Sequence, residues 1–599
     1  MTQVGRGREF TTRPELRGTF GMVSSTHWLA SAGGMRMLEL GGNAFDAAVA
    51  AGFVLQVVQP HLNGPGGDMP AVVWDDRVGA PEVLCAQGVA PAAASIGAFE
   101  DLGLDAVPGT GLLAACVPGA VDGWLLMLRD RGTLGLREVL EPAIGYAAAG
   151  HPTSPEMVGA VAAVEHVLRD AWPSTAAVYL PGGALPAAHS LFRNPDLART
   201  YERLVHESEV SQGDREDRID AARNAFSRGF VAEHIGRYLA SAEVEDSSGR
   251  RHRSLLAVDD LATWSASWER PATRGFRGFT VCKPGAWSQG PVLLQQLALL
   301  DGLDLDRLER GGPDYVHTLV EAGKLAYADR EAWYGDEPDV PLTALLSDGY
   351  AAERRALIGP DSSPALRPGS PDARTPLPID VRLQATAEAA GAGEPTVLDA
   401  RADVHRGDTC HVDVADRFGN MVSATPSGGW LQSSPVIPGL GFPLGTRLQM
   451  ADLDRRRPNA LRPGKRPRTT LSPGLVLRGG EPYLAFGTPG GDQQDQWALQ
   501  FLLNVVLFGD DLQAAIDRPV FHSAHFPSSF HPRTAIPGRV VVEDRYPADT
   551  IAGLRRRGHD VRLAGPWSLT RTCAAGRDVD GVLRAGATPR GMEGYAIGR

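Results

Sequence analysis

The feature that most constrains the fold of this chain is a short hairpin pattern that follows a long stretch without periodicity. Residues 411–415 and 421–425 suit two paired strands, and residues 416–420 contain a Gly-Asn pair that is typical of a tight connection. Residues from about 361 to 408 are rich in Pro, Ala, Gly, Asp and Arg, which predicts an exposed, mobile tether. Thr409 therefore lies where a loose segment meets a rigid hairpin.

A threonine at the start of a strand is ordinarily there for its β-propensity, so its position alone assigns no function. The surrounding residues, however, resemble the self-processing site of the γ-glutamyltranspeptidase family: Thr409-Cys410-His411, a hydrophobic strand, Asp416, Gly419-Asn420 and a second strand. Members of that family are N-terminal-nucleophile hydrolases. They are made as one chain, cut themselves before a threonine, and use the freed threonine as the catalytic nucleophile.

The resemblance implies a division of the chain into two fragments. Residues 1–408 would form a large subunit that ends in the tether, and residues 409–599 would form a small subunit that begins with Thr409. The two fragments would remain one intertwined domain, as a heterodimer of the chain's own pieces, and further dimerisation stays open. The fold implied is an αββα sandwich with two central antiparallel sheets and added helices from the large subunit.

Further motifs extend the resemblance over most of residues 19 to 597. A small-residue helix that begins near Asn43 runs into the glycine-rich turn at residues 57–68, and the pair resembles the N-terminal signature of the family. Residues 117–124 match a helix start that contains Pro-Gly in the family. Residues 321–330 are similar to the family's helix before the tether.

The chemistry that the resemblance implies is nucleophilic catalysis by a hydroxyl. A hydroxyl is a weak nucleophile at neutral pH, but an adjacent α-amino group with a pKa of about 8 can act as its general base. Cys410 is the competing candidate, since a thiol is the stronger nucleophile. The spacing to Asp416 and Gly419-Asn420 places Thr409, and not Cys410, on the family's nucleophile.

Downstream residues supply the rest of the expected site. Gly490 and Gly491 match the family's Pro-Gly-Gly, whose backbone N–H groups form the oxyanion hole, although the same residues read alone would predict only a turn. Thr469 and Thr470 occupy the place of two serines that contact substrate. Ser427 retains a hydroxyl that would orient the Thr409 amine.

Several positions depart from the γ-glutamyl-specific members. The arginine that binds the substrate α-carboxylate is matched by Ile96, and an asparagine that contacts the substrate is matched by Gly429. The aspartate that binds the substrate amino group falls near Asp452. We therefore expect an acyl group other than γ-glutamyl.

Two arginines are candidates for a relocated positive charge at the site. Arg447 and Arg468 both lie near segments that line the family's site, but each is at least as well explained as a surface residue or as a partner of Asp452 or Asp454. With a relocated charge, we expect glutaryl-type acyl amides or small dicarboxylic monoamides such as oxamate as substrates. Without it, we expect a neutral acyl amide.

The sequence thus favours a self-processing amide hydrolase or acyltransferase that acts on an acyl amide or a γ-glutamyl bond through an acyl-Thr409 intermediate. One alternative is an amidohydrolase of the oxamate or glutaryl type without γ-glutamyl activity. A second alternative is an unprocessed scaffold that has kept only the fold. The acyl substrate, and the choice between hydrolysis and transfer, stay open at this point.

Composition excludes other classes of function. A formal net charge of -12 argues against a nucleic-acid surface. Five widely spaced cysteines suit a reducing compartment, and we expect a cytoplasmic protein because no apolar signal segment or membrane-spanning run is present. No metal-binding or phosphate-binding motif occurs, so we expect no cofactor and no metal, and we interpret His61, His317 and His411 as core or hydrogen-bonding residues.

Overall fold

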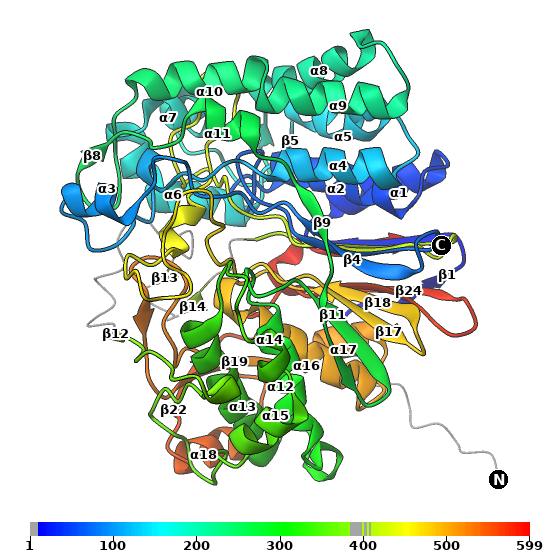
Figure 1. Ribbon diagram of the computed structural model, residues 1–599. Coiled ribbons are helices and arrows are strands. Elements are labelled where there is room, and N and C mark those ends of the chain that lie inside the picture. The colour runs from blue at the N-terminus through cyan, green and yellow to red at the C-terminus, as the bar shows by residue number, and fades with distance from the viewer. Residues whose placement is uncertain (1–9, 384–397, 400–403, 406–408) are drawn as a thin grey trace.

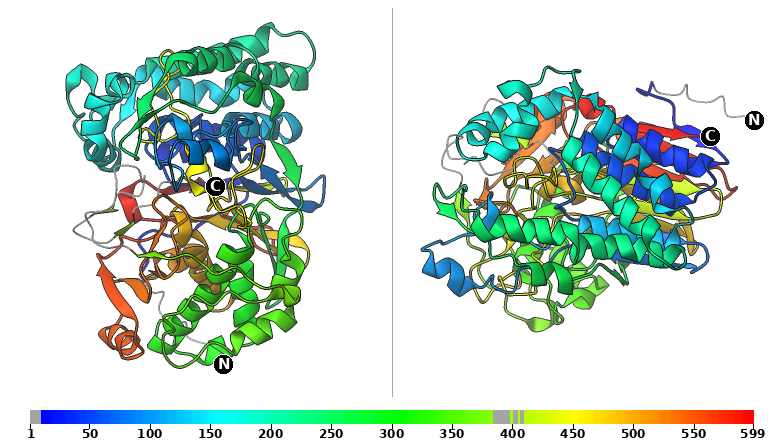
Figure 2. Two further views of the ribbon diagram at one scale, coloured as in Figure 1. Left: turned by 60° about the vertical axis from the view of Figure 1, so that its left-hand side comes forward. Right: turned by 90° about the horizontal axis from the view of Figure 1, so that it is seen from above.

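The computed structural model describes residues 10–383, 398–399, 404–405 and 409–599. Two seven-stranded sheets lie face to face in the middle of the molecule, and helices cover the outer face of each sheet (Figure 1). The same four layers are visible after rotation in the left view of Figure 2. The predicted αββα sandwich with two central antiparallel sheets is confirmed.

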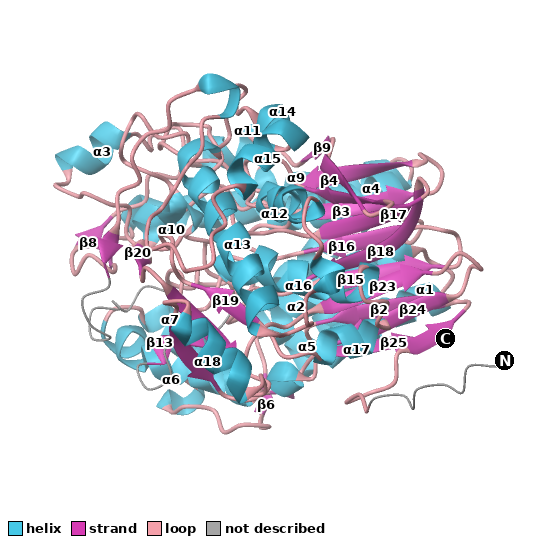
Figure 3. Cartoon of the chain, turned by 90° about the horizontal axis from the view of Figure 1, so that it is seen from below, coloured by secondary structure: helices cyan, strands magenta, loops and turns pink. Residues whose placement is uncertain are grey.

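One sheet carries the predicted hairpin at its centre. Its strand order is β25-β2-β15-β16-β3-β4-β9, and every neighbouring pair is antiparallel. Figure 3 shows these strands side by side. Their bounds are β2 Gly21–Ser25, β3 Ala71–Asp75, β4 Ala80–Cys85, β9 Ser267–Glu269, β15 Val412–Asp416, β16 Met421–Ala424 and β25 Tyr595–Gly598. The two hairpin strands therefore lie within one residue of their predicted positions.

The second sheet is also antiparallel throughout, with the order β1-β24-β23-β18-β17-β11-β10. Its strands are β1 Leu16–Gly18, β10 Ala272–Phe276, β11 Phe279–Lys283, β17 Gly474–Arg478, β18 Glu481–Gly487, β23 Cys573–Arg577 and β24 Leu583–Ala587. Each sheet contains strands that precede Thr409 in the sequence and strands that follow it. A cut before Thr409 would thus leave the two pieces joined by sheet hydrogen bonds.

The space between the sheets is filled by small and medium apolar side chains, among them Met22, Val72, Met421, Leu475 and Ala585. Because strand side chains alternate between the two faces of a sheet, the other face of each sheet is available to pack against helices. These outer contacts form two larger apolar clusters, one on each side of the sandwich. The core is therefore divided into three layers by the two sheets.

Helices α1, α2, α4, α5, α8, α9 and α10 pack over the sheet that carries the hairpin, and α12, α13, α16, α17 and α18 pack over the other (Figure 1). Their bounds are α1 Trp28–Glu39, α2 Ala44–Val58, α4 Ala120–Arg131, α5 Leu136–Ala149, α8 Pro195–Val210, α9 Arg215–Ser227, α10 Phe230–Ser241, α12 Pro291–Asp301, α13 Pro313–Trp333, α16 Gln494–Val506, α17 Leu512–Asp517 and α18 Ala548–Arg556. Among the described residues, no helix has the length and apolar character that crossing a lipid bilayer requires.

Apart from short 3-10 helices, the remaining α-helices and strands are mostly short and lie around this sandwich. They are α3 Ile96–Asp101, α6 Pro155–Asp170, α7 Pro173–Tyr179, α11 Val258–Thr263, α14 Leu342–Leu345, α15 Asp348–Arg355, β5 His151–Pro152, β6 Leu191–Phe192, β7 Val244–Glu245, β8 Arg251–His252, β12 Arg382–Leu383, β13 Leu398–Asp399, β14 Val404–His405, β19 Phe521–Ser523, β20 Thr534–Ala535, β21 Arg539–Glu543 and β22 Asp560–Ala564.

Helix α2 begins where the sequence predicts. The Asn43 side chain accepts hydrogen bonds from the backbone of Phe45 and Asp46, and the Asp46 carboxylate accepts one from the Asn43 backbone. This reciprocal capping satisfies N–H groups that the first turn of a helix cannot pair internally. Every residue of α2 is buried, and the Ala- and Gly-rich sequence allows the helix to pack closely against its neighbours.

Residues 361–383, the first half of the predicted tether, make specific contacts with α13. Lys324 Nζ donates to Ser362 Oγ at 2.8 Å, Arg367 pairs with Glu321 at 3.1 Å, and the Gly369 N–H donates to Asp329 at 2.7 Å. Charged residues buried on α13 hold this segment, although its own sequence has no periodicity. Most of the second half of the predicted tether lies outside the described residues.

Candidate active site

Thr409 lies just before β15 and faces Ser427. The two hydroxyl oxygens are 3.2 Å apart, and both side chains are fully buried. Ser427 is held in turn by Asp68, since the backbones of these two residues exchange hydrogen bonds of 2.7 and 3.0 Å. The structure thus brings together the predicted Thr409 and Ser427, and it places Asp68 beside them.

The neighbouring Cys410 points into the protein core. Its thiol donates to Gln59 Oε1 at 3.1 Å and accepts from Asn63 Nδ2 at 3.1 Å. Burial raises the pKa of the Cys410 thiol well above its usual value. Because the thiolate is the reactive form of cysteine, this raised pKa disfavours a nucleophilic role for Cys410.

The three histidines named from the sequence are all buried. His411 contacts Thr425 Oγ1 at 2.9 Å and Asp413 Oδ1 at 3.0 Å, which is a hydrogen-bonding role within the hairpin. Burial lowers the pKa of His61 to about 3, so this imidazole stays neutral at physiological pH. His317 lies in a cluster that the sequence pattern did not reveal.

That cluster joins His317 and Glu321 of α13 to His559, with potential ligand atoms within 4.8 Å of one another. His317 Nδ1 lies 2.8 Å from His559 Nε2, so the two imidazoles already share a hydrogen bond. Glu321 is paired with Lys324 at 2.6 Å and with Arg367 at 3.1 Å. Two cations beside the carboxylate of the cluster disfavour a third, and we interpret the cluster as polar packing rather than as a metal site.

The loop that follows β18 contains Gly490 and Gly491. Both have a positive φ, +129° and +53°, which glycine adopts readily and other residues do not. A Cβ on Gly490 would lie 2.3 Å from the Trp497 ring. β18 itself ends at Gly487, where a Cβ would lie 2.3 Å from the His411 ring, so this loop starts close to the hairpin.

The same loop is fixed by Asp492, which accepts from the backbone and the hydroxyl of Ser529 at 2.8 and 2.7 Å and pairs with Arg330. Gln289 Nε2 also donates to the Gly491 carbonyl at 3.2 Å. A rigid loop of this kind presents its backbone N–H groups in a fixed geometry, as an oxyanion hole requires.

Thr469 and Thr470 lie against the turn at residues 287–290. The Thr469 backbone accepts from the Gln289 N–H at 2.9 Å and donates to the Trp287 carbonyl at 2.9 Å. The Thr470 hydroxyl is buried and has no hydrogen-bond partner among the described residues. Of the two predicted threonines, Thr470 is therefore the one whose hydroxyl can form a hydrogen bond with a substrate.

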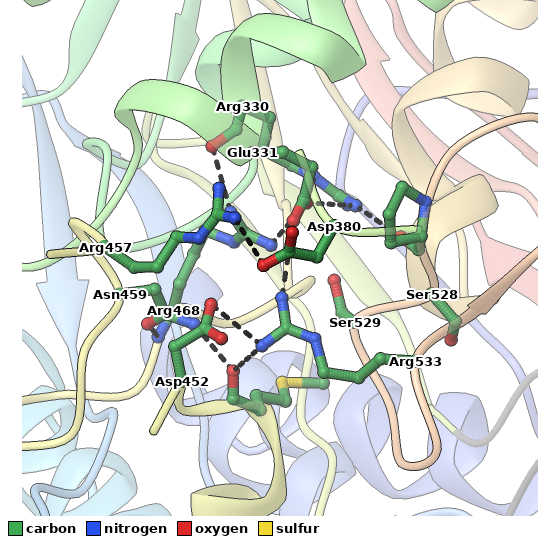
Figure 4. A network of polar contacts seen from close by, with 12 residues as sticks. Arg330, Glu331, Asp380, Asp452, Arg457, Asn459, Arg468, Ser528, Ser529 and Arg533 are labelled. Carbon is green, nitrogen blue, oxygen red and sulfur yellow. Dashed lines mark hydrogen bonds and ion pairs between the residues drawn. The ribbon is translucent and has the colours of Figure 1, made fainter. Parts of the chain in front are cut away.

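Asp452 has a charged partner in the structure. Its carboxylate lies 3.1 Å from Arg533, which also approaches Glu331 at 3.3 Å (Figure 4). These residues line a cavity of about 390 Å³ together with Gln449 and residues of the segment 379–382. A substrate amino group at Asp452 would therefore have to share that carboxylate with an arginine.

The two arginines proposed from the sequence have different surroundings. Arg468 is buried and bonded to Glu331 at 2.6 Å and to the Arg330 carbonyl at 2.9 Å, and burial lowers the pKa of its guanidinium to about 10. We interpret Arg468 as part of the packing. Arg447 pairs neither with Asp452 nor with Asp454, and that expectation is wrong.

The partner of Arg447 is Asp68, whose Oδ2 accepts from Arg447 Nε at 2.7 Å. Burial raises the pKa of the Asp68 carboxyl, although the Arg447 charge acts in the opposite direction. The guanidinium also lies over the Trp430 ring, 5.4 Å from its centroid. Its Nη2 is buried with no hydrogen-bond partner in the part of the chain that the structure describes.

The two positions that differ from the γ-glutamyl-specific members offer no polar side chain. Ile96 is buried in an apolar cluster with Ala90, Phe99 and Leu448. Gly429 has a φ of +62°, and a Cβ there would lie 2.8 Å from the Gly67 nitrogen, so no side chain fits. Neither position can bind a substrate carboxylate through its side chain.

Two residues of the site were not singled out from the sequence. Asp68 ends the glycine-rich turn at residues 57–68, so a sequence motif marks its position, but no local pattern indicates its pairing with Arg447. Arg533 has a φ of +62°, a backbone conformation that favours glycine, and no local pattern points to it.

Comparison with known proteins gives consistent matches over the whole chain. A sequence model of gamma-glutamyltranspeptidase matches residues 30–598. The glutathione hydrolase-like YwrD proenzyme of Bacillus subtilis (strain 168) is 30% identical over 587 residues, which covers 97% of this chain and 99% of the relative. The Acylase ACY 1 proenzyme of Pseudomonas sp. (strain SE83) is also 30% identical and covers 99% and 97%. The solved structure of LmbA2991HD is similar with a TM-score of 0.92 at 54% identity, over 99% of this chain and 100% of that one.

Proposed function

Because this chain belongs to the γ-glutamyltranspeptidase family, we propose that it cuts itself between Asp408 and Thr409 and then hydrolyses or transfers acyl groups through Thr409. Residues 1–408 and 409–599 would be the two subunits. The contact that carries the proposal is the one between the Thr409 and Ser427 hydroxyls, 3.2 Å apart and fully buried at the head of a central strand.

The proposed reaction follows from the groups around Thr409. Its hydroxyl oxygen attacks the carbonyl carbon of the substrate amide, and the hydroxyl proton passes to the α-amine of the same residue. This amine, with a pKa of about 8, then delivers the proton to the leaving nitrogen. Ser427 orients the amine, and the N–H groups of Gly490 and Gly491 stabilise the tetrahedral oxyanion.

The resulting ester between Thr409 and the acyl group is resolved by water or by an acceptor amine. The attacking molecule gives its proton to the Thr409 amine, the bond between the acyl carbon and the threonine oxygen breaks, and the oxygen regains a proton from the same amine. Thr470, whose hydroxyl has no partner among the described residues, is a further proposed contact to the substrate.

For the substrate, the structural differences favour an acyl group other than γ-glutamyl. Ile96 and Gly429 provide no polar side chain, and the Asp452 carboxylate is shared with Arg533. An unpaired substrate carboxylate or ammonium in a partly closed site is costly. We therefore place acyl amides that lack the α-amino acid group, whether of the glutaryl, oxamate or neutral type, ahead of γ-glutamyl amides.

A panel of amides tests this assignment on the purified protein. We expect hydrolysis of glutaryl, oxamic or neutral acyl amides to exceed hydrolysis of γ-glutamyl amides by at least about tenfold in kcat/KM, because one missing charged contact costs about 1.5 to 3 kcal/mol. The Thr409→Ala protein, prepared identically, supplies the background rate. Robust γ-glutamyl transfer to glycylglycine would contradict the assignment.

A further inference from the structure

We propose that Arg447 binds a carboxylate on the acyl portion of the substrate. This inference rests on the proposed function and names the chemical class of its substrate, a monoamide of a dicarboxylic acid. Arg447 lies in the short turn of 3-10 helix Arg447–Met450, and its side chain is 2% exposed.

The position of Arg447 relative to the nucleophile is fixed through Asp68. The Asp68 side chain accepts from Arg447 Nε at 2.7 Å, while the Asp68 backbone pairs with Ser427, whose hydroxyl contacts Thr409. This bond to Asp68 uses Nε and leaves N–H groups on the two terminal nitrogens. Asp68 thus orients the guanidinium without occupying all of its donors.

The Nη2 end of this guanidinium lies beside Gly428, the residue that follows Ser427. A Cβ on Gly428 would be 3.4 Å from Arg447 Nη2 and 3.1 Å from Asp68 Oδ2. Gly428 has a φ of +75° and contributes no side chain at this point, and Arg447 Nη2 is itself buried. Arg447 Nη2 has no hydrogen-bond partner among the described residues. This donor therefore lies beside Gly428, the residue that directly follows Ser427.

Leaving a charged donor unpaired in a buried position is unfavourable, and an incoming acceptor relieves that cost. A carboxylate is the acceptor that matches a guanidinium best in charge and geometry. Arg447 Nη1 contacts the Met450 sulfur at 3.8 Å, which is a weak acceptor. Both terminal nitrogens can thus contribute to a bidentate pair.

The other buried cations near the site are less suited to this role. Arg468 has two acceptors, Glu331 and the Arg330 carbonyl, at 2.6 and 2.9 Å. Arg533 lies between two carboxylates, Asp452 and Glu331, which would repel a third. The Trp430 ring beneath Arg447 also keeps its guanidinium in place without competing for its N–H groups.

The test uses a pair of substrates that differ only in the carboxylate: glutaryl-p-nitroanilide and its monomethyl ester. The variant is Arg447→Gln combined with Asp68→Asn, since removing Arg447 alone would leave a buried carboxylate unpaired and destabilise the fold. We expect the ratio of kcat/KM for the acid over the ester to fall about 10- to 100-fold, the range of one charged hydrogen-bonded contact. An unchanged ratio would overturn the inference.

Arg533→Gln is the matched comparison, because it removes another arginine near the site. A fall of the acid-to-ester ratio in this variant, with no fall in the double variant, would assign the carboxylate to Arg533 instead. Binding of glutarate, measured by calorimetry, gives a readout that needs no turnover. We expect its Kd to weaken at least about tenfold in the double variant, and an equal Kd would contradict the inference.

These readouts also separate the two proposals. If the wild-type protein binds glutarate through Arg447 but hydrolyses no amide, the proposed function fails and the carboxylate site stands. If amides are hydrolysed with no preference between the acid and the ester, and glutarate does not bind, the function stands and the Arg447 site is rejected.

Discussion

Replacing Thr409 by alanine is expected to give a folded, uncut and inactive chain of 599 residues. The hydroxyl that attacks substrate is also the group that would attack the Asp408 carbonyl during maturation, so one substitution removes both reactions. The substitution also removes the 3.2 Å hydrogen bond to Ser427, and a bond of this kind stabilises the fold by only about 1 kcal/mol. A denaturing gel, circular dichroism and the amide panel together measure the three properties.

Thr409→Ser is the matched control for this variant. Serine keeps the oxygen but lacks the methyl group that restricts the χ1 rotamer of threonine, so we expect cleavage to continue at a lower rate. Cleavage of the alanine variant into the same two fragments would contradict the role of Thr409. Complete absence of cleavage in the serine variant would show that the methyl group is needed for the attack geometry.

The second large effect is expected for Gly490→Ala. The residue has a φ of +129°, and the new methyl group would lie 2.3 Å from the Trp497 ring, so the loop must shift. Displacing one backbone donor from an oxyanion hole typically costs about 10² to 10³ in kcat. We expect a decrease of at least that size in the processed enzyme.

Gly509→Ala separates this effect from backbone strain alone. Gly509 also has a positive φ, +71°, but no described atom lies within 4 Å of a Cβ placed there. We expect the Gly509 variant to lose some thermal stability while kcat stays within a factor of about three, because strain of this kind costs about 1 to 3 kcal/mol. A kcat for Gly490→Ala that is no lower than that of Gly509→Ala would contradict the oxyanion role.

The hairpin and the start of α2 could be predicted because their signals are local, whereas the αββα sandwich was an expectation from the family resemblance. The hairpin strands follow from their residue pattern and the Gly-Asn connection, and the start of α2 follows from the capping residue Asn43. The paired glycines at 490 and 491, which read alone predict a turn, both have positive φ angles. In each of these cases the residues that form the structure are neighbours in the chain.

The ion pairs of the site could not be predicted, because the two residues of each pair are far apart in the sequence. Arg447 and Asp68 are separated by 379 positions, so the sequence suggested nearer acidic residues instead. The contacts of residues 361–383 could not be predicted for a related reason. Its residues carry no periodicity of their own, and they are held by Glu321, Lys324 and Asp329, which belong to a helix that precedes them.

The most direct test of the account is the intact mass of the purified wild-type protein, combined with sequencing of any new N-terminus. We predict two species under denaturing conditions, residues 1–408 and residues 409–599, with Thr409 at the new N-terminus and both species eluting together under native conditions. Both sheets contain strands of both pieces, which explains why the pieces would stay associated. A single uncut chain, or a new terminus at Cys410, would contradict the account.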